Sequence, residues 1–168
     1  MLPIPRSALL AALLLTPLAP GAARAEAGET PAENRPPGLV LLQQRLSQQG
    51  MTAVGVYGVE VDATTPGLRR VKVWEERPDN VTVRVDSIRC TPAAPMRVTS
   101  DGSRFFLREL NPGGAITAAN RMDHLIWWAT CFPELAGQEP AGLAARARQL
   151  GYSGLLRESE QVLPGRSR

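Results

Sequence analysis

The chain of 168 residues carries a formal net charge of +3, with 43% hydrophobic and 21% charged residues, one histidine and two cysteines. This length suits one ordinary domain, and the small net charge lacks the broad positive field that nucleic-acid binding requires, so no nucleic-acid partner is expected. A single histidine and the lack of any CxxC spacing exclude a typical zinc site, and we expect neither a metal nor a cofactor.

The first 25 residues have the pattern of a secretory signal peptide. Arg6 precedes an apolar run over 8–15, and Ala23 and Ala25 supply the small residues that a signal peptidase recognises. The run is too short to cross a bilayer core of about 30 Å, and no other segment approaches that apolar length. We therefore expect cleavage after Ala25, export to the periplasm or out of a bacterial cell, and no integral membrane segment in the mature protein.

The rest of the chain is predicted to contain one domain between two unstructured segments. Residues 26–37 are acidic, contain prolines and lack apolar periodicity, which predicts a flexible linker. Residues 38–157 form the domain, and the polar residues 158–168 are predicted to be a disordered tail. Cys90 and Cys131 are the only cysteines, and an isolated pair in an oxidising compartment favours a disulfide.

The domain is predicted to begin with a short amphipathic helix. Leu39, Leu42 and Leu46 repeat at helical spacing, and Gly50 offers a left-handed stop. Residues 52–61 then alternate as a strand, with a bend near their end.

Two hairpins are predicted to follow, and their turns set the register. Residues 77–80 fit a type I turn with Asn80 in the left-handed region, which gives a three-residue loop and places Trp74 opposite Arg84. A cation then lies beside an indole on one face of the sheet.

The second hairpin is predicted to turn on Asp101 and Gly102, a strong type I′ signal. Counting outward from this turn places Arg97 opposite Phe106. The other face of this hairpin is apolar.

Two helices are predicted after the hairpins. One begins after Thr117 and runs to about Thr130, and its centre is apolar all round, which indicates burial on most sides. The other begins near Pro140 and ends at Gly151. The predicted fold class is therefore α+β, with an N-terminal helix, an antiparallel meander of four to five strands and two C-terminal helices.

The sequence offers one weak set of catalytic candidates. Arg121, Asp123 and His124 lie close together on the predicted helix, where His124 is a candidate general base and Arg121 a candidate anion clamp. The alternative is that His124 is a hydrogen-bonded residue at the boundary of the core. No G-x-S-x-G or S-x-x-K motif is present, so the common hydrolase nucleophiles are absent.

The sheet offers a better candidate for binding. In the predicted registers Trp74, Arg84, Arg97 and Phe106 project from one face, and aromatic rings with polar neighbours suit a sugar, a peptide or a partner protein. The alternative is that the helices cover this face. The expected function is a non-enzymatic extracytoplasmic binding or assembly module with a protein or carbohydrate partner.

Two other functions remain open from the sequence. One is a small hydrolase or isomerase that uses His124 and Asp123. The other is a structural envelope protein that docks on a partner through the helix containing Trp127 and Trp128.

Overall fold

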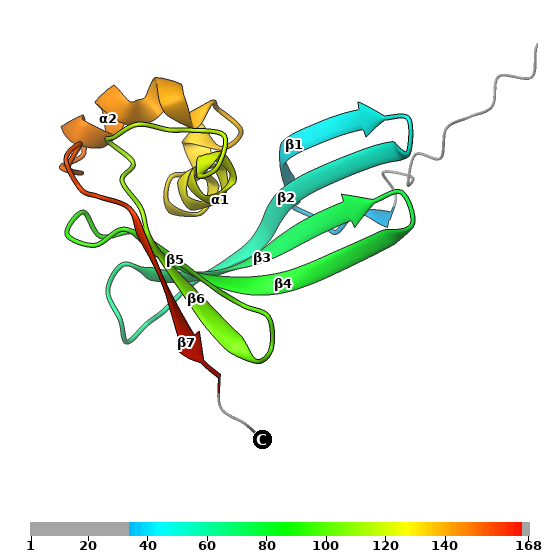
Figure 1. The fold of residues 1–168 in the computed structure, drawn as a ribbon, viewed down its shortest axis with the longest axis horizontal. Coiled ribbons are helices and arrows are strands. Elements are labelled where there is room, and N and C mark those ends of the chain that lie inside the picture. Colours follow the sequence, from blue (N-terminus) through cyan, green and yellow to red (C-terminus); the bar gives the residue numbers. More distant parts are fainter. Residues whose placement is uncertain (1–33, 166–168) are drawn as a thin grey trace, which may run out of the picture.

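The computed structural model describes residues 34–165 of the chain (Figure 1). The predicted signal peptide, residues 1–25, and residues 26–33 of the predicted linker lie outside the described part. Within residues 34–165, no helix combines the length and the apolar character that crossing a membrane requires.

One antiparallel sheet of seven strands forms most of the fold (Figure 1). The strands follow each other in the sheet as they do in the sequence. Their bounds are β1 Val40–Ser47, β2 Gly50–Val61, β3 Leu68–Arg77, β4 Asn80–Arg89, β5 Met96–Ser100, β6 Arg104–Glu109 and β7 Ser159–Pro164. Between β6 and β7 lie α1 (Arg121–Cys131), the short 3-10 helices η2 (Pro133–Leu135) and η3 (Pro140–Leu143), and α2 (Ala144–Gln149).

The predicted fold is wrong in its first helix and in its strand count, because residues 40–47 form the edge strand β1. Leu39, Leu42 and Leu46 have helical spacing, but only Leu42 is buried, and Leu46 is 66% exposed. Pairing with β2 satisfies the backbone of this segment, and a bulge at Leu42 accompanies its burial in the core. Gly50, with a φ of 115°, follows the hairpin turn and does not end a helix.

Strand β7 forms the opposite edge, within the residues that the sequence assigns to a polar tail. All six of its residues are exposed, so no apolar pattern marks the segment as a strand. β6 supplies a full row of backbone partners from Arg104 to Glu109. Two side-chain bonds support the register, since Arg108 Nε donates to Glu160 Oε2 at 2.5 Å and Ser159 Oγ donates to Glu109 Oε2 at 2.7 Å.

The β3–β4 hairpin has a two-residue loop over 78–79 instead of the predicted three-residue loop. No residue other than glycine has a positive φ within residues 34–165, so Asn80 lacks the left-handed conformation that the prediction required. Trp74 consequently lies opposite Val83. A shift of one residue exchanges the two faces of a strand, so Trp74 and Arg84 point to opposite sides of the sheet.

The β5–β6 hairpin turns on Gly102 and Ser103 rather than on Asp101 and Gly102. The Asp101 Oδ1 atom accepts hydrogen bonds from two backbone N–H groups at 2.9 and 2.7 Å, which stabilises this turn. The register differs from the predicted one by two residues. An even shift keeps the faces, so Arg97 and Phe106 still lie on the same side of the sheet.

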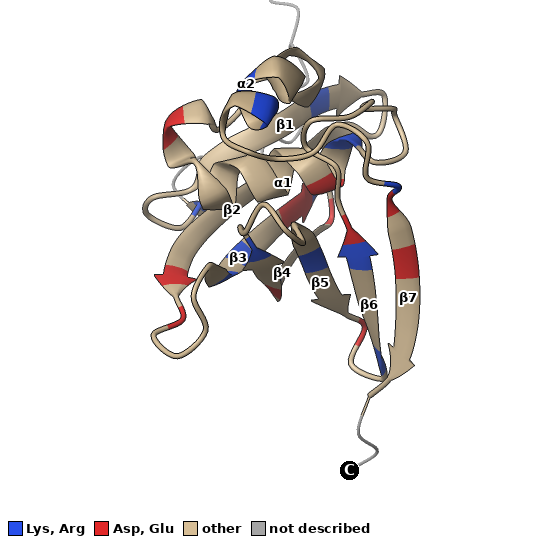
Figure 2. Ribbon diagram, turned by 90° about the vertical axis from the view of Figure 1, so that its left-hand side faces the viewer, with Lys and Arg blue, Asp and Glu red and all other residues tan. Residues whose placement is uncertain are grey.

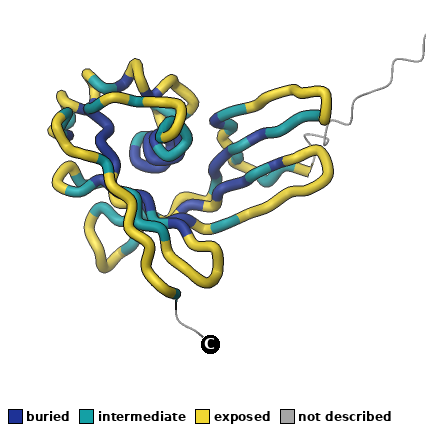
Figure 3. The backbone as a smooth tube through the Cα atoms, viewed as in Figure 1, coloured by how far each residue is buried: buried dark blue, intermediate teal, exposed yellow. Residues whose placement is uncertain are grey.

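The helices pack against one face of the curved sheet, and buried positions concentrate between α1 and the middle of the sheet (Figure 3). Helix α1 overlaps the predicted helix but begins at Arg121, and both Trp127 and Trp128 are almost completely buried. The predicted disulfide is confirmed: Cys90 and Cys131 are bonded, with their Cα atoms 5.6 Å apart. This bond joins the end of β4 to the end of α1.

Candidate binding site

The helices leave part of the concave side of the sheet uncovered. In Figure 1, α1 and α2 lie over one half of the sheet, and the β1–β2 and β3–β4 hairpins extend beyond them. The strand pairing and the pocket shared by Arg84, Thr99 and Phe106 place the helix-facing side chains of this outer part and of the adjoining β5–β6 hairpin on one surface. We call it the open face, and its residues are Thr52, Val54, Glu75, Thr82, Arg84, Thr99 and Phe106.

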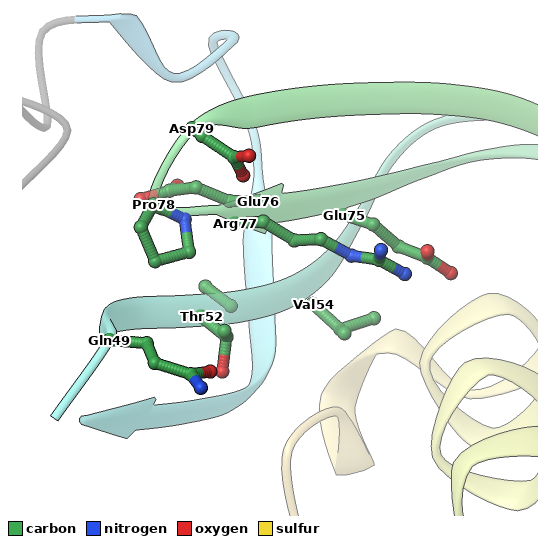
Figure 4. Close-up of a pocket in the computed structure, with 9 residues that line it drawn as sticks. Gln49, Thr52, Val54, Glu75, Glu76, Arg77, Pro78 and Asp79 are labelled. Carbon is green, nitrogen blue, oxygen red and sulfur yellow. The ribbon is translucent and has the colours of Figure 1, made fainter. Parts of the chain in front are cut away.

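A pocket of about 650 Å³ lies at the tips of β2 and β3, at one end of the open face (Figure 4). Its lining residues are Gln49, Thr52, Ala53, Val54, Glu75, Glu76, Arg77, Pro78 and Asp79. Val54 points toward the helices in Figure 4 and supplies an apolar wall, while the carboxylate of Glu75 and the guanidinium of Arg77 supply charge. The Thr52 hydroxyl donates to the backbone oxygen of Arg45, so this hydroxyl is not a candidate nucleophile.

A second pocket, of about 320 Å³, lies between β4 and the β5–β6 hairpin. Its lining residues are Arg84, Arg97, Thr99, Ser100, Asp101, Phe106 and Arg108. The ring of Phe106 has two guanidinium groups above it, with the Arg104 and Arg108 carbons 5.3 and 5.9 Å from its centre. Such cation contacts hold an aromatic ring in place at the surface. We call this cavity the Phe106 pocket.

An unbroken chain of alternating arginines and carboxylates runs beneath the Phe106 pocket and joins it to the first one. In order, its members are Glu75, Arg84, Asp86, Arg97, Asp123, Arg108 and Glu160. These side chains come from five strands and from α1. Figure 2 shows basic positions on β5 and β6 beside an acidic position on β7. Glu75 lines the first pocket and Arg84 lines the Phe106 pocket, so their ion pair connects the two.

Arg97 is the centre of this chain and is only 3% exposed. It donates to Asp86 Oδ2 from Nε and Nη2 at 2.9 and 2.7 Å, and to Asp123 Oδ1 from Nη1 at 2.5 Å. The other oxygen of Asp86 lies 3.3 Å from Arg84 Nε without hydrogen-bond geometry. Every charge has an opposite partner, so the pocket presents fixed hydrogen-bonding groups and no uncompensated positive field.

Three of the four predicted ligand-binding residues gather at this pocket. Arg84 and Phe106 lie at its surface, and Arg97 lies beneath it rather than projecting into solvent. Trp74 lies on the opposite face of the sheet. Its indole Nε1 donates to Glu76 at 3.3 Å, and on this face Leu39, from the segment that leads into β1, lies over Gly55, the residue opposite Trp74 on β2.

The three predicted catalytic residues do not line one cleft. Arg121 binds Glu139 with its Nε and Nη2 atoms, while Asp123 binds Arg97. The His124 side chain is completely buried, and its Nε2 atom lies 2.6 Å from a carboxylate oxygen of Glu158. His124 is therefore hydrogen-bonded, as the alternative interpretation of the sequence expected, but it lies inside the core rather than at its boundary.

Glu158 forms hydrogen bonds with three residues, one of which is His124. The sequence analysis does not predict this role, because Glu158 lies in the predicted tail. Burial raises its pKa, but hydrogen bonds from His124, from Asn120 at 2.7 Å and from the Asn111 N–H at 2.9 Å outweigh burial and hold the pKa below its usual value. A pocket of about 230 Å³ beside it is lined by Glu158 and Asp123. Ser159 also lines it, and its hydroxyl donates to the carboxylate of Glu109.

Within residues 34–165, no group of three or more histidine, cysteine, aspartate or glutamate side chains is arranged to hold a metal ion. Comparison of the chain with family models, with curated protein sequences and with solved structures finds no match. The chemistry of the open face is therefore the guide to function.

Proposed function

We propose that this protein is an exported, non-enzymatic binding module that holds its ligand on the open face, with the Phe106 pocket at the centre. The observation that supports this most is the half-buried ring of Phe106, which lines the pocket among arginines whose positions are set by ion pairs. Preorganised polar groups around an aromatic surface are typical of small binding sites. The curvature of the sheet extends the same surface toward the first pocket.

The balance of charge indicates the kind of ligand. Arg84 is paired with Glu75, and Arg108 is paired with both Asp123 and Glu160. An anion would therefore compete with carboxylates that are already in place. A neutral polar ligand, such as a carbohydrate or an uncharged stretch of peptide, forms hydrogen bonds with both groups of each pair and disturbs neither.

The two other functions that the sequence left open receive no support from the geometry. An acid–base enzyme would need His124 within reach of a substrate, and its ring is buried against Glu158. A docking helix would need exposed tryptophans, and Trp127 and Trp128 are both in the core.

Two features support a proposal for the compartment. Residues 1–25 have the pattern of a signal peptide, and Cys90 and Cys131 form a disulfide, which persists in oxidising compartments. We propose the periplasm or the extracellular space on this basis.

The test is NMR spectroscopy of the oxidised protein over residues 26–168, titrated with neutral oligosaccharides and with an extended, uncharged peptide. We expect chemical-shift changes in β4, β5 and β6 around Phe106, and we expect Phe106→Ala to remove them. Phe105→Ala is the matched control, because Phe105 is the neighbouring residue and points to the other face of the same strand. Shift changes that cluster elsewhere, or that survive in Phe106→Ala, would exclude the open face.

A further inference from the structure

The outer part of β4 has no partner strand on one side. Strand β4 pairs with β3 over its entire length, but it pairs with β5 only at Ser87, Ile88 and Arg89. Figure 1 shows the β1–β4 and β5–β7 parts of the sheet diverging beyond this junction. Among the described residues, none forms a backbone ladder with the remaining side of residues 81–86. We call this stretch the open edge of β4.

The backbone groups at the open edge can be identified from the alternation of an antiparallel ladder. The Cys90 N–H donates to the Gly67 oxygen on the β3 side. Successive residues of a strand direct their N–H and C=O groups to opposite sides, so even-numbered residues of β4 face β3 and odd-numbered ones face away. Val81, Val83 and Val85 therefore present their N–H and C=O groups at the open edge.

The open edge lacks most of the features that block strand pairing. Natural sheets protect such edges with proline, with charged side chains, especially lysine, or with a bulge. β1 carries a bulge at Leu42 and β7 ends at Pro164, whereas residues 81–86 contain no proline, lysine or bulge, and their two charged side chains, Arg84 and Asp86, form ion pairs within the protein. The side chains of Val83 and Val85, 47% and 57% exposed, add an unpartnered apolar row beside the edge.

The open edge adjoins the Phe106 pocket. Arg84 lies between Val83 and Val85 along β4, and its side chain lines the pocket on the helix-facing side of the sheet, while the side chains of the two valines lie on the other side. A strand laid along the edge would place alternate side chains on the two faces. One set would enter the Phe106 pocket, and the other would cover the two valines.

We propose that the open edge of β4 binds an extended peptide segment of a partner protein, which adds to the sheet as a strand. This inference rests on the proposed function and names its ligand class. The bound segment alternates neutral polar residues, which face the Phe106 pocket, with apolar residues, which pack on Val83 and Val85. A carbohydrate has no regular row of donors and acceptors to match the six outward groups of Val81, Val83 and Val85, whereas a peptide backbone has one.

The direct test uses a synthetic peptide of alternating threonine and valine with a lysine at each end, titrated against the oxidised protein by NMR. We expect binding that shifts the amide signals of the three valines. A second peptide with the same side chains carries N-methyl groups on alternate amides of one edge, and a third carries them on the other edge. One of the two methylated peptides should lose at least tenfold in affinity, because it no longer donates to β4.

A matched pair of variants tests the protein side of the contact. Val83→Pro removes one outward N–H and leaves the bonds between β3 and β4 in place, since proline is tolerated where the N–H faces away from the sheet. Val83→Thr keeps both the N–H group and the β-branched shape. We expect Val83→Pro to weaken peptide binding at least tenfold and Val83→Thr to change it less than threefold.

The outcomes separate this inference from the proposed function. Equal affinity for all three peptides would overturn strand addition, and so would full binding by a folded Val83→Pro protein. Oligosaccharide binding that depends on Phe106, without any peptide binding, would overturn this inference while the proposed function stands. Sedimentation that shows a dimer of the free protein, converted to a monomer by Val83→Pro, would assign the edge to a second copy and overturn the peptide partner. If Val83→Pro fails to fold, the methylated peptides alone decide.

Discussion

The Asp123 carboxylate on α1 accepts a hydrogen bond of 2.5 Å from Arg97 on β5, and this contact ties the helix to the part of the sheet that forms the Phe106 pocket. The same guanidinium holds Asp86 on β4. One buried arginine therefore positions three elements at once. The shape of the proposed site depends on a residue that a ligand does not need to touch.

Replacing Arg97 with alanine is expected to lower the free energy of unfolding by about 3–5 kcal/mol, because the buried Asp86 would lose both of its hydrogen bonds and keep only the ion pair with Arg84. Urea unfolding followed by tryptophan fluorescence measures this loss. Arg104→Ala is the control, since Arg104 pairs with Asp101 at an exposed site and its removal should cost less than about 1 kcal/mol. Equal losses in the two variants would show that Arg97 is not the centre of the network.

Removing the Cys90–Cys131 disulfide is expected to lower the free energy of unfolding by about 4 kcal/mol, the chain-entropy value for two residues 41 positions apart. The double variant Cys90→Ser with Cys131→Ser provides the comparison with the oxidised protein under identical urea conditions. A reducing agent should destabilise the wild type and leave the double variant unchanged. A difference below about 1 kcal/mol would mean that the unfolded chain gains little freedom when the bond is absent.

Gly55→Ala tests the position of the segment that leads into β1. A Cβ atom on Gly55 would lie 2.8 Å from Leu39 Cδ1 and 2.8 Å from the Val40 oxygen, so this segment must shift. We expect a loss of about 1–3 kcal/mol, typical of overpacking, measured by thermal and urea unfolding. Gly142→Ala is the matched control, because nothing lies within 4 Å of its Cβ position, and alanine there should stabilise by about 0.4–1 kcal/mol.

The stability of the protein is expected to fall in acid partly through Glu158. Its pKa in the folded protein lies below the ordinary value of 4.5, so its contribution is fully present above that value and is lost as the pH falls through the folded pKa. Glu158→Gln should lower the free energy of unfolding at neutral pH by about 1–3 kcal/mol and flatten its dependence on pH below about 4.5. Unfolding curves at a series of pH values measure both effects. An unchanged pH profile in Glu158→Gln would contradict this role.

Sequence patterns predict the elements whose signals are local. The helical pattern around Trp127 and Trp128 finds α1, and the two turn sequences find both hairpins. The disulfide follows from the presence of only two cysteines in a chain with a signal-peptide pattern. Turn chemistry does not decide the loop length, however, and a two-residue loop before Asn80 is enough to move Trp74 to the other face.

The elements that the sequence misses are those whose stability comes from pairing partners. β1 and β7 are edge strands with few buried side chains, so their backbones are ordered by β2 and β6 and not by an apolar pattern. The role of Arg97 is missed for a related reason. Asp86 and Asp123 lie 11 and 26 residues away along the chain, and only the fold shows that both converge on one guanidinium.

The order of the strands also determines how the sheet can form as the chain is released from its N-terminal end. β2 to β6 each pair with the strand before them, so six strands can assemble one hairpin at a time with short loops to close. β7 is different, because residues 110–158, which contain the helical layer, separate it from β6 in the sequence. Until β7 pairs with it, β6 is the exposed edge of an unfinished sheet, and Glu158 is not yet beside His124. The pairing of β7 with β6 and the contact between Glu158 and His124 therefore both require this long loop to close.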